Sequence, residues 1–237
     1  MKNLVIIKYG SSCISRKNIR SFAKQVAKLK SEGKEVLVVS SGSVRLGKEI
    51  GVSSINAKGS LGLWASLGSA RIVELWRLAL ERHGIVVAQI LVTHSDLDES
   101  SYLKLSLEEL LAEGVVPVVN ENDVLSDTEL VKLKTGGDND GLAAHIALRL
   151  EAETLILVSS GVNGYVSGGS VQAKVDLSSV SQEDHFSKTE HGTGGIESKL
   201  VAANSALSGG VGRVFYAGMS SDLADVIDNQ SGTEFYL

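Results

Sequence analysis

The chain has 237 residues, of which 43% are apolar and 22% are charged, and its formal net charge is −5. A chain of this length buries about 70% or more of the surface that it exposes when unfolded, so its core requires neither disulfides nor a structural metal. Its basic residues are spread along the sequence, which argues against a nucleic-acid partner. We therefore expect a single globular domain over residues 1–237.

The N-terminal segment and the cysteine content exclude further classes. Cys13 is the single cysteine, and one thiol forms neither an intrachain disulfide nor a metal site. The apolar run Leu4–Ile7 is too short for the core of a signal peptide. Apolar runs also stay below the length of about 18 residues that indicates a membrane span. We expect a soluble, cytoplasmic protein without a membrane partner.

Short β-branched runs alternate with longer helical patterns along the chain. In chain order the patterns predict a strand at 4–8, a helix at 17–31, a strand at 35–39, a helix at 61–82, a strand at 85–92, a helix at 100–112, a strand at 115–119, a hairpin at 124–133, a helix at 139–150, a strand at 154–158, a helix at 198–207, and strands at 211–217 and 232–237. Residues 159–190 form the least regular segment. The alternation and the continuous apolar strands predict an α/β fold, a three-layer αβα sandwich with a mostly parallel central sheet.

Small-residue turns follow the first two predicted strands. Ligands of parallel α/β sheets bind beyond the carboxyl ends of the strands, so these turns are candidate binding segments. Lys8 ends the first strand and is followed by Gly10 and Ser11, where backbone N–H groups and a lysine could hold an oxyanion. Residues 40–43 form a second such turn. Each turn taken alone is better explained as an ordinary strand-to-helix connection.

Polar and glycine-rich segments follow later strands. Residues 120–123, with the sequence Asn-Glu-Asn-Asp, come directly after a buried strand. Residues 136–141 lead into a helix, and an N-cap explains only one of their three adjacent polar residues. The glycine-rich residues 192–195 precede a helix with Lys199 in its first turn. This order of residues fits neither a P-loop nor a dinucleotide-binding fingerprint.

Two lysines and several carboxylates therefore follow the strands of one predicted sheet. Phosphoryl transfer depends mostly on positioning and on neutralising spreading negative charge, which Lys8 and Lys199 could supply. The two lysines repel each other, so we expect a carboxylate between them, drawn from Asp123, Asp138 and Asp140. These residues predict a small-molecule kinase that lacks a P-loop.

The motifs together resemble the signature of the glutamate 5-kinases, a group within the amino acid kinase family. The matching segments occur in that group's order over nearly the whole chain, at residues 8–12, 40–42, 120–123, 137–140 and 192–199. The resemblance implies the amino acid kinase fold, and phosphorylation of the γ-carboxylate of L-glutamate by ATP, the first step of proline biosynthesis. It implies Mg²⁺ that arrives with ATP, held by phosphate oxygens and water instead of a protein metal site. We also expect a homo-oligomer.

The resemblance implies a role for individual residues. The catalytic residues would be Lys8 and Lys199, which hold the transferring phosphoryl group, and Asp140, which orients both lysines. The positions that match glutamate-binding residues are Ser41, Asp123 and Asn139, with Asp138 nearby. The nucleotide-binding residues would be Lys8, Gly10, Ser11, Ser159, Ser160, Thr193, Gly194, Gly195 and Lys199, with Gly10 and Ser11 offering N–H groups to the γ-phosphate.

The sequence departs from this group at three places. Residues 159–169 replace the segments that shape the adenine and ribose site, and Ser160 stands at the position of an aspartate. Ser69 stands where the group usually has glutamine. Because the sequence ends at Leu237, we expect a short form without the RNA-binding-like PUA domain of many members. Two other functions stay open: a catalytically reduced homologue that senses glutamate, which the altered 159–169 segment favours, and a kinase for another small acidic substrate.

Isolated residues receive structural interpretations. Cys13 is expected to be a packed small side chain, because no histidine lies near it in sequence to activate a nucleophile. Trp64 and Trp76 are expected to contribute to helix packing or a subunit contact. The histidines share no metal-ligand spacing; they are His83, His94, His145, His185 and His191.

Overall fold

The computed structural model describes residues 3–50, 60–93, 96–97, 101–125, 139–180 and 195–237. Eight of the strands in these residues form one sheet, in the order β3-β4-β2-β1-β5-β9-β10-β8. All strands from β3 to β9 in this order run parallel, β10 is antiparallel to β9, and β8 is parallel to β10. The mostly parallel sheet confirms the α/β prediction.

The strands of the large sheet are short and uniform. Their bounds are β1 Leu4–Tyr9, β2 Glu35–Ser40, β3 Val87–Val92, β4 Val116–Glu121, β5 Thr154–Ser159, β8 Lys174–Asp176, β9 Arg213–Gly218 and β10 Thr233–Tyr236. A separate hairpin pairs β6 Val166–Ser167 with β7 Ser170–Val171.

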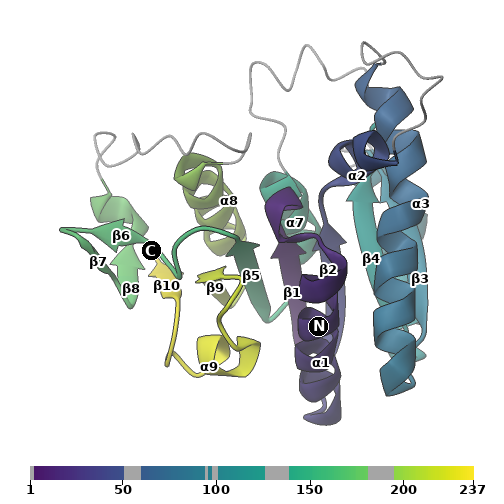
Figure 1. Ribbon diagram of the computed structural model, residues 1–237. Coiled ribbons are helices and arrows are strands. Elements are labelled where there is room, and N and C mark those ends of the chain that lie inside the picture. Colours follow the sequence, from purple (N-terminus) through teal and green to yellow (C-terminus); the bar gives the residue numbers. More distant parts are fainter. Residues whose placement is uncertain (1–2, 51–59, 94–95, 98–100, 126–138, 181–194) are drawn as a thin grey trace.

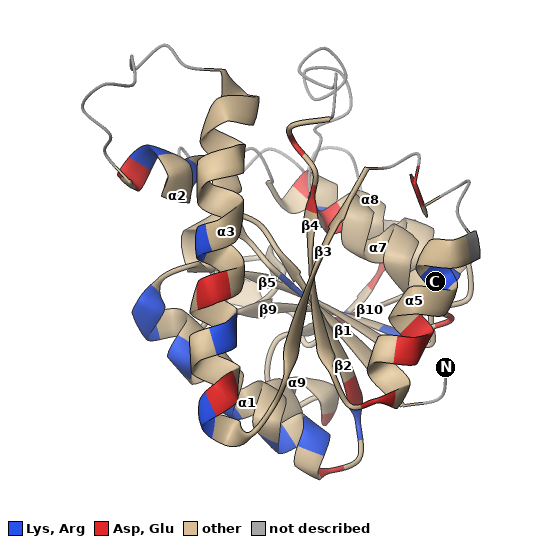
Figure 2. Cartoon of the chain, turned by 90° about the vertical axis from the view of Figure 1, so that its right-hand side faces the viewer, with Lys and Arg blue, Asp and Glu red and all other residues tan. Residues whose placement is uncertain are grey.

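Helices cover both faces of the sheet. Their bounds are α1 Arg16–Ser31, α2 Ser43–Glu49, α3 Leu61–Leu80, α5 Ser101–Ala112, α7 Asn139–Arg149, α8 Ile196–Ser208 and α9 Leu223–Ile227, with single 3-10 turns η1 Ser11–Cys13, η2 Glu81–His83 and η3 Leu177–Ser179. Helices α1, α3 and α9 lie on one face and α5, α7 and α8 on the other, as the edge-on view in Figure 2 shows beside the face view in Figure 1. The three-layer αβα sandwich is therefore confirmed.

Alternate residues of the central strands serve the two layers. On β1, Val5 and Ile7 pack into the core under α1 and α3, whereas Leu4 and Ile6 pack into the core under α7 and α8. All four side chains are fully buried. A strand covered on both faces has no polar side, which is why the sequence shows a continuous apolar run here.

Local signals set the limits of α1. Its N-cap is Ser15, whose side chain accepts a hydrogen bond from the backbone N–H of Asn18 at 3.2 Å. Its buried residues recur at helical spacing, and they are Ile19, Phe22, Ala23, Val26 and Leu29. The chain leaves the helix at Gly33, whose φ of +82° is a conformation that glycine adopts without strain. The sequence pattern predicted this helix to within one residue.

Short elements depart from the sequence-based expectations. Helices α2 and α9, of 7 and 5 residues, were not predicted, because neither is long enough to show a helical period. Three strands, β6 to β8, lie in the segment expected to be irregular. The hairpin expected at 124–133 lies mostly outside the described residues.

Helices α2 and α3 cross at very close range. A Cβ atom on Gly68 would lie 1.8 Å from the carbonyl oxygen of Ser43, and one on Gly47 would lie 1.8 Å from that of Trp64. Only glycine permits this approach, which fixes α2 and the turn before it against the long helix. Both tryptophans are buried in packing, as expected, and Trp76 donates from Nε1 to Ser40 Oγ at 3.1 Å. No helix in the described part of the chain is long and apolar enough to cross a membrane.

Candidate active site

The predicted site residues gather at one edge of the sheet. Strands β1, β2, β4 and β5 are parallel, so their carboxyl ends meet there. Lys8 is the second-last residue of β1, Ser41 directly follows β2, Asp123 follows β4, and Ser159 ends β5. The N-termini of α7 and α8 bring Asp140 and Lys199 to the same edge, as described next.

A buried cluster of three charged side chains lies at the centre of this edge. Lys8 Nζ lies 2.5 Å from Asp140 Oδ1, and Lys199 Nζ lies 3.1 Å from Asp140 Oδ2. Lys8 is 3% exposed, Asp140 0% and Lys199 4%. The carboxylate expected between the two lysines is thus Asp140. We call these three residues the lysine–carboxylate triad; within it, two ammonium groups share one carboxylate.

The surrounding helices hold this carboxylate in place. Asp140 lies in the first turn of α7, where the partial positive charge of a helix N-terminus stabilises an anion. The hydroxyl of Ser198 lies 2.9 Å from Asp140 Oδ2 and 2.9 Å from the carbonyl oxygen of Gly195. Gly195 is the N-cap of α8. The start of α8 and the start of α7 are therefore tied together through the triad.

An aromatic side chain from a distant strand borders the triad. The ring centroid of Tyr216 on β9 lies 5.8 Å from Lys199 Nζ. The hydroxyl of Tyr216 shares a hydrogen bond of 2.9 Å with Ser159 Oγ. Lys199 is thus positioned between a carboxylate and the face of an aromatic ring, an arrangement that limits where its ammonium group can move.

The turn after β1 is held by backbone and arginine contacts. The N–H of Gly10 donates to the carbonyl oxygen of Val158 at 3.1 Å, so it is already bonded and not open to a phosphate. In the described part of the chain the N–H groups of Ser11 and Ser12 have no acceptor. Arg45 on α2 donates from Nε to the carbonyl oxygen of Ser11 at 3.2 Å and from its guanidinium to that of Ile14. Arg45 therefore ties this turn to α2.

The turn after β2 packs onto the turn after β1. Gly42 has a φ of +106°, and a Cβ atom there would lie 3.5 Å from Ser11 Cα. Glycine is required by the backbone conformation at this position. Beyond the first turn, Ser12 Oγ accepts a hydrogen bond of 2.6 Å from Ser160 Oγ. The two serines at the position of the family's nucleotide segment, Ser159 and Ser160, thus face the triad's aromatic neighbour and the Ser11–Ser12 turn.

The residues expected to bind a small substrate form two hydrogen-bonded pairs. Asn139 Nδ2 donates to Ser41 Oγ at 2.7 Å, and Ser43 Oγ donates to Asp123 Oδ2 at 2.9 Å. Asn139 Oδ1 is buried without a hydrogen-bond partner among the described residues. A buried amide oxygen without a donor indicates a place where a ligand or water donates. Of the other predicted site residues, Asp138, Thr193 and Gly194 lie outside the described residues.

Cys13 is buried beside this site and is not reactive. Its Sγ atom faces the carbonyl oxygen of Val158 at 3.9 Å. Burial raises the pKa of Cys13 from 9.0 to about 11, and the nearby positive charge of Lys8 offsets only part of that rise. The thiol is therefore protonated at neutral pH, which confirms its interpretation as a packed side chain.

Four contributors to the site were not predicted: Ser43, Arg45, Ser198 and Tyr216. Ser198 adjoins Lys199 in a predicted motif, so helix geometry could have placed it near Asp140. Ser43 likewise follows a predicted turn directly. Arg45 and Tyr216 act through contacts between distant elements, and no local spacing signals such contacts.

Comparison with known proteins assigns the chain to a family. Residues 3–216 match the model of the amino acid kinase family. The chain belongs to this family. Glutamate 5-kinases from Vibrio vulnificus and Yersinia pestis are 30% and 31% identical to it, over 92% and 96% of its length. The chain spans 62% and 65% of the length of these two relatives.

Solved structures of the amino acid kinase fold resemble this chain. A carbamate kinase from Giardia lamblia, solved with AMP-PNP, has a TM-score of 0.70 and 12% identity, and the match covers 98% of this chain and 97% of that one. An N-acetylglutamate synthase from Neisseria gonorrhoeae, solved with coenzyme A and L-arginine, has a TM-score of 0.67 and 14% identity over 98% of this chain and 61% of that one. At these identities the likeness concerns the fold alone.

Proposed function

We propose that this chain phosphorylates the γ-carboxylate of L-glutamate with ATP and so carries out the first step of proline biosynthesis. The observation that carries the proposal is the buried lysine–carboxylate triad at the carboxyl edge of the sheet. Membership of the amino acid kinase family supports a kinase, and the relatives named glutamate 5-kinases support glutamate as the acceptor. The activity of the whole protein is part of the proposal, because the chain spans only part of those relatives' length.

The chemistry needs no general base. The γ-carboxylate of glutamate has a pKa near 4.3 and is already ionised at neutral pH, so no proton has to leave before attack. One carboxylate oxygen attacks the γ-phosphorus of ATP, the new C–O–P bond forms, and the bond from phosphorus to the β-phosphate oxygen breaks to release ADP. What remains for the protein is to align the two substrates and to balance negative charge.

Lys8 and Lys199 supply that balance from buried positions. Their ammonium groups would contact the oxygens of the transferring phosphoryl group, in surroundings where charge is weakly screened. Asp140 orients both lysines and reduces their mutual repulsion. With an ammonium group on each of its oxygens, Asp140 is a positioning residue and has no role as a proton acceptor.

The turn after β1 would contact the γ-phosphate from the other side. The free N–H groups there belong to Ser11 and Ser12, since that of Gly10 donates to Val158. Both oxygens of Asp140 contact a lysine, so this carboxylate does not suit a bare metal cation, and the described residues fit Mg²⁺ as a complex with ATP, held by phosphate oxygens and water. When bound, Mg²⁺ supplies further neutralisation of the phosphate charge.

The two hydrogen-bonded pairs would bind glutamate. Its α-ammonium group requires an anion, and the carboxylate of Asp123 would supply it. The hydroxyl of Ser43 holds that carboxylate in place through a hydrogen bond. The unpartnered Oδ1 of Asn139 offers a further acceptor to the same ammonium group, while Ser41 fixes the other end of that amide. The γ-carboxylate would then extend toward the triad.

An assay of hydroxamate formation tests the proposal. Purified chain with L-glutamate, MgATP and hydroxylamine is expected to yield γ-glutamyl hydroxamate, because hydroxylamine traps the acyl phosphate. Binding of glutamate without any product would favour the alternative of a glutamate sensor, which the altered 159–169 segment supports. Turnover with another acidic substrate from a panel, and none with glutamate, would overturn glutamate specificity and keep the kinase.

A further inference from the structure

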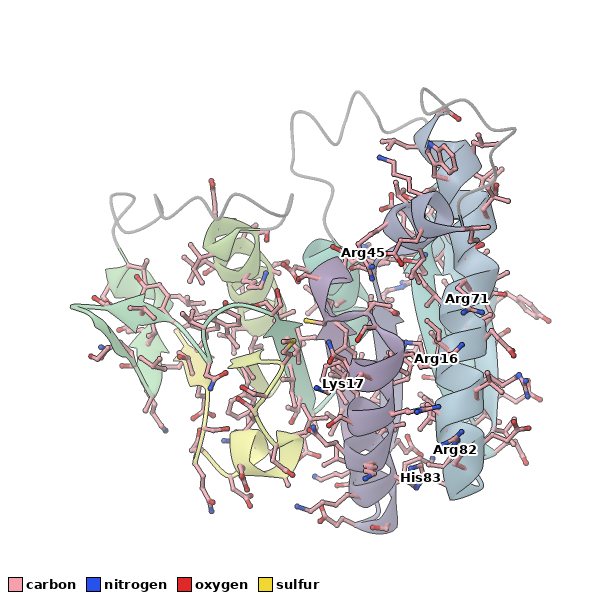
Figure 3. The ribbon with its side chains drawn as sticks, viewed as in Figure 1. Arg16, Lys17, Arg45, Arg71, Arg82 and His83 are labelled. Atoms are coloured by element: carbon pink, nitrogen blue, oxygen red, sulfur yellow. The ribbon has the colours of Figure 1, made fainter. Side chains whose placement is uncertain are left out.

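A pocket with three arginines lies between α1 and α3, away from the lysine–carboxylate triad. Its volume is about 410 Å³. Arg16 and Arg20 of α1 and Arg82 of η2 line it, together with Glu81 and apolar side chains of α3 that include the buried Leu75. Figure 3 shows Arg16 between α1 and α3, and Arg82 of η2 at the lower end of α3. We call this the arginine pocket.

The arginines of this pocket carry charge that the described residues do not neutralise. The side chains of Arg16, Arg20 and Arg82 form no hydrogen bond or ion pair with any residue that the structure describes. The one carboxylate in the lining, Glu81, binds Arg77 instead, at 2.9 Å. Three arginines without a described partner therefore line one pocket of a chain whose net charge is −5.

The position of these charges on α1 is unfavourable in the absence of an anion. The first turn of α1 contains no acidic residue, and the whole helix has six basic residues and none that is acidic. Basic side chains at a helix N-terminus face the positive end of the helix dipole, which destabilises the helix. Figure 2 shows Lys and Arg segments on both helices where α1 lies beside α3. A bound anion would relieve both the dipole effect and the repulsion among the arginines.

We propose that the arginine pocket binds a small anion with two or more phosphate groups. A guanidinium group presents paired N–H donors that match two phosphate oxygens, so three arginines suit a diphosphate better than a single charge. The apolar wall formed by α3 leaves room for a compact organic part of such a molecule. Nucleic acid is a poorer fit, because the net charge of the chain is −5 and its pI is about 5.6. No residue of the proposed kinase site takes part, so this inference does not depend on the proposed function.

Binding of pyrophosphate to the full chain tests the inference. Calorimetric titration of the double variant Arg20→Gln/Arg82→Gln should lose one binding event of the unchanged chain, or show it weakened at least about tenfold. The matched control is Lys24→Gln, which removes an exposed charge from the same helix outside the pocket. It should bind pyrophosphate as the unchanged chain does. All three side chains are exposed, and circular dichroism checks that each variant is folded.

Two further measurements locate the site and identify its chemistry. Pyrophosphate should slow amide hydrogen exchange in peptides that cover residues 16–20 and 79–83. Identical titrations for the unchanged chain and the double variant, or slower exchange only around Lys8 and Lys199, would overturn the proposal. Citrate binding with equal affinity at the same arginines would overturn the assignment to phosphate. None of these readouts requires turnover, so failure of the kinase proposal would leave them interpretable.

Discussion

Lys8 on β1 reaches Asp140 on α7, and the ammonium nitrogen lies 2.5 Å from Oδ1 of the carboxylate with both side chains buried. Lys199 binds the other oxygen, so one carboxylate serves two ammonium groups. Replacing Asp140 by asparagine keeps the shape and removes the charge that the lysines share. We expect Asp140→Asn to lower the free energy of unfolding, measured in urea, by about 3–5 kcal/mol. The kcat should fall by about 100-fold or more.

A surface ion pair provides the matched control for this variant. Lys174 is 61% exposed and binds Glu234 at 3.1 Å. Lys174→Gln should change the unfolding free energy by less than about 1 kcal/mol, because solvent screens exposed pairs. Equal losses of unfolding free energy in Lys174→Gln and Asp140→Asn would contradict the claim that the buried triad stabilises the fold more than an exposed ion pair does.

Ser43 is expected to affect substrate affinity more than catalysis. Its hydroxyl donates to Asp123, which we propose as the partner of the glutamate α-ammonium group. Without this bond the carboxylate can rotate. A hydrogen bond to a charged group contributes about 1.5–3 kcal/mol, so Ser43→Ala should raise KM for glutamate by about tenfold or more with little change in kcat. The control is Ser66→Ala on α3, whose hydroxyl donates to the carbonyl oxygen of Leu63. A fall in kcat with KM unchanged would contradict the assigned role.

Gly68 is expected to contribute to stability through the close crossing of α2 and α3. A Cβ atom at this position would lie 1.8 Å from the carbonyl oxygen of Ser43, a backbone atom that cannot move without shifting α2. Gly68→Ala should therefore lower the unfolding free energy by about 1–3 kcal/mol through overpacking. Gly141→Ala on α7 is the control, since a Cβ atom there meets nothing within 4 Å. Gly141→Ala should raise the unfolding free energy by up to about 1 kcal/mol, because alanine favours a helix more than glycine does. A similar gain in Gly68→Ala would contradict the close crossing of α2 and α3.

The buried thiol of Cys13 should make the free energy of unfolding fall as the pH rises above 9. Burial raises its pKa from 9.0 to about 11, so between these values the folded chain keeps a proton that the unfolded chain has lost. The stabilisation is complete below pH 9 and is lost as pH rises toward 11, with a slope of at most about 1.4 kcal/mol per pH unit from this thiol. Tyr9 adds to the slope, because burial, and to a lesser extent Cys13, raise its pKa as well.

Urea unfolding at several pH values from 8 to about 11 measures this slope. The slope should become shallower in Cys13→Ala, because the contribution of the buried thiol is then removed. Comparing slopes instead of absolute stabilities removes the packing effect of the substitution. An unchanged slope would contradict a thiol that stays protonated in the folded chain.

Much of the fold could be predicted because apolar residues recur at regular spacing in its main helices and strands. Helix α1 and strand β1 show their packing directly in the order of apolar residues, and both were predicted to within one residue. Helix α2 could not be predicted, since its position depends on the approach of Gly47 to Trp64 on α3. Strand β8 could not be predicted because its three residues join the sheet edge only through β10.

Those parts of the site that come from sequence motifs at the ends of strands could be predicted. Lys8, Asp140 and Lys199 come from three separate motifs, and the topology of a parallel sheet brings such positions together. The bond from Gly10 to Val158 was not predictable, because it links two strands that are far apart in sequence. For the same reason the contact between Tyr216 and Lys199 has no local signal.

The measurement that tests the central claim most directly compares kcat and glutamate affinity in Lys199→Ala. The kcat is measured by hydroxamate formation, and glutamate affinity by calorimetry without nucleotide. If Lys199 contacts the transferring phosphoryl group, kcat should fall by about 100-fold or more while the Kd for glutamate changes less than about threefold. Equal losses of kcat and glutamate affinity would contradict the account, because they would place Lys199 in substrate binding and not in phosphoryl transfer.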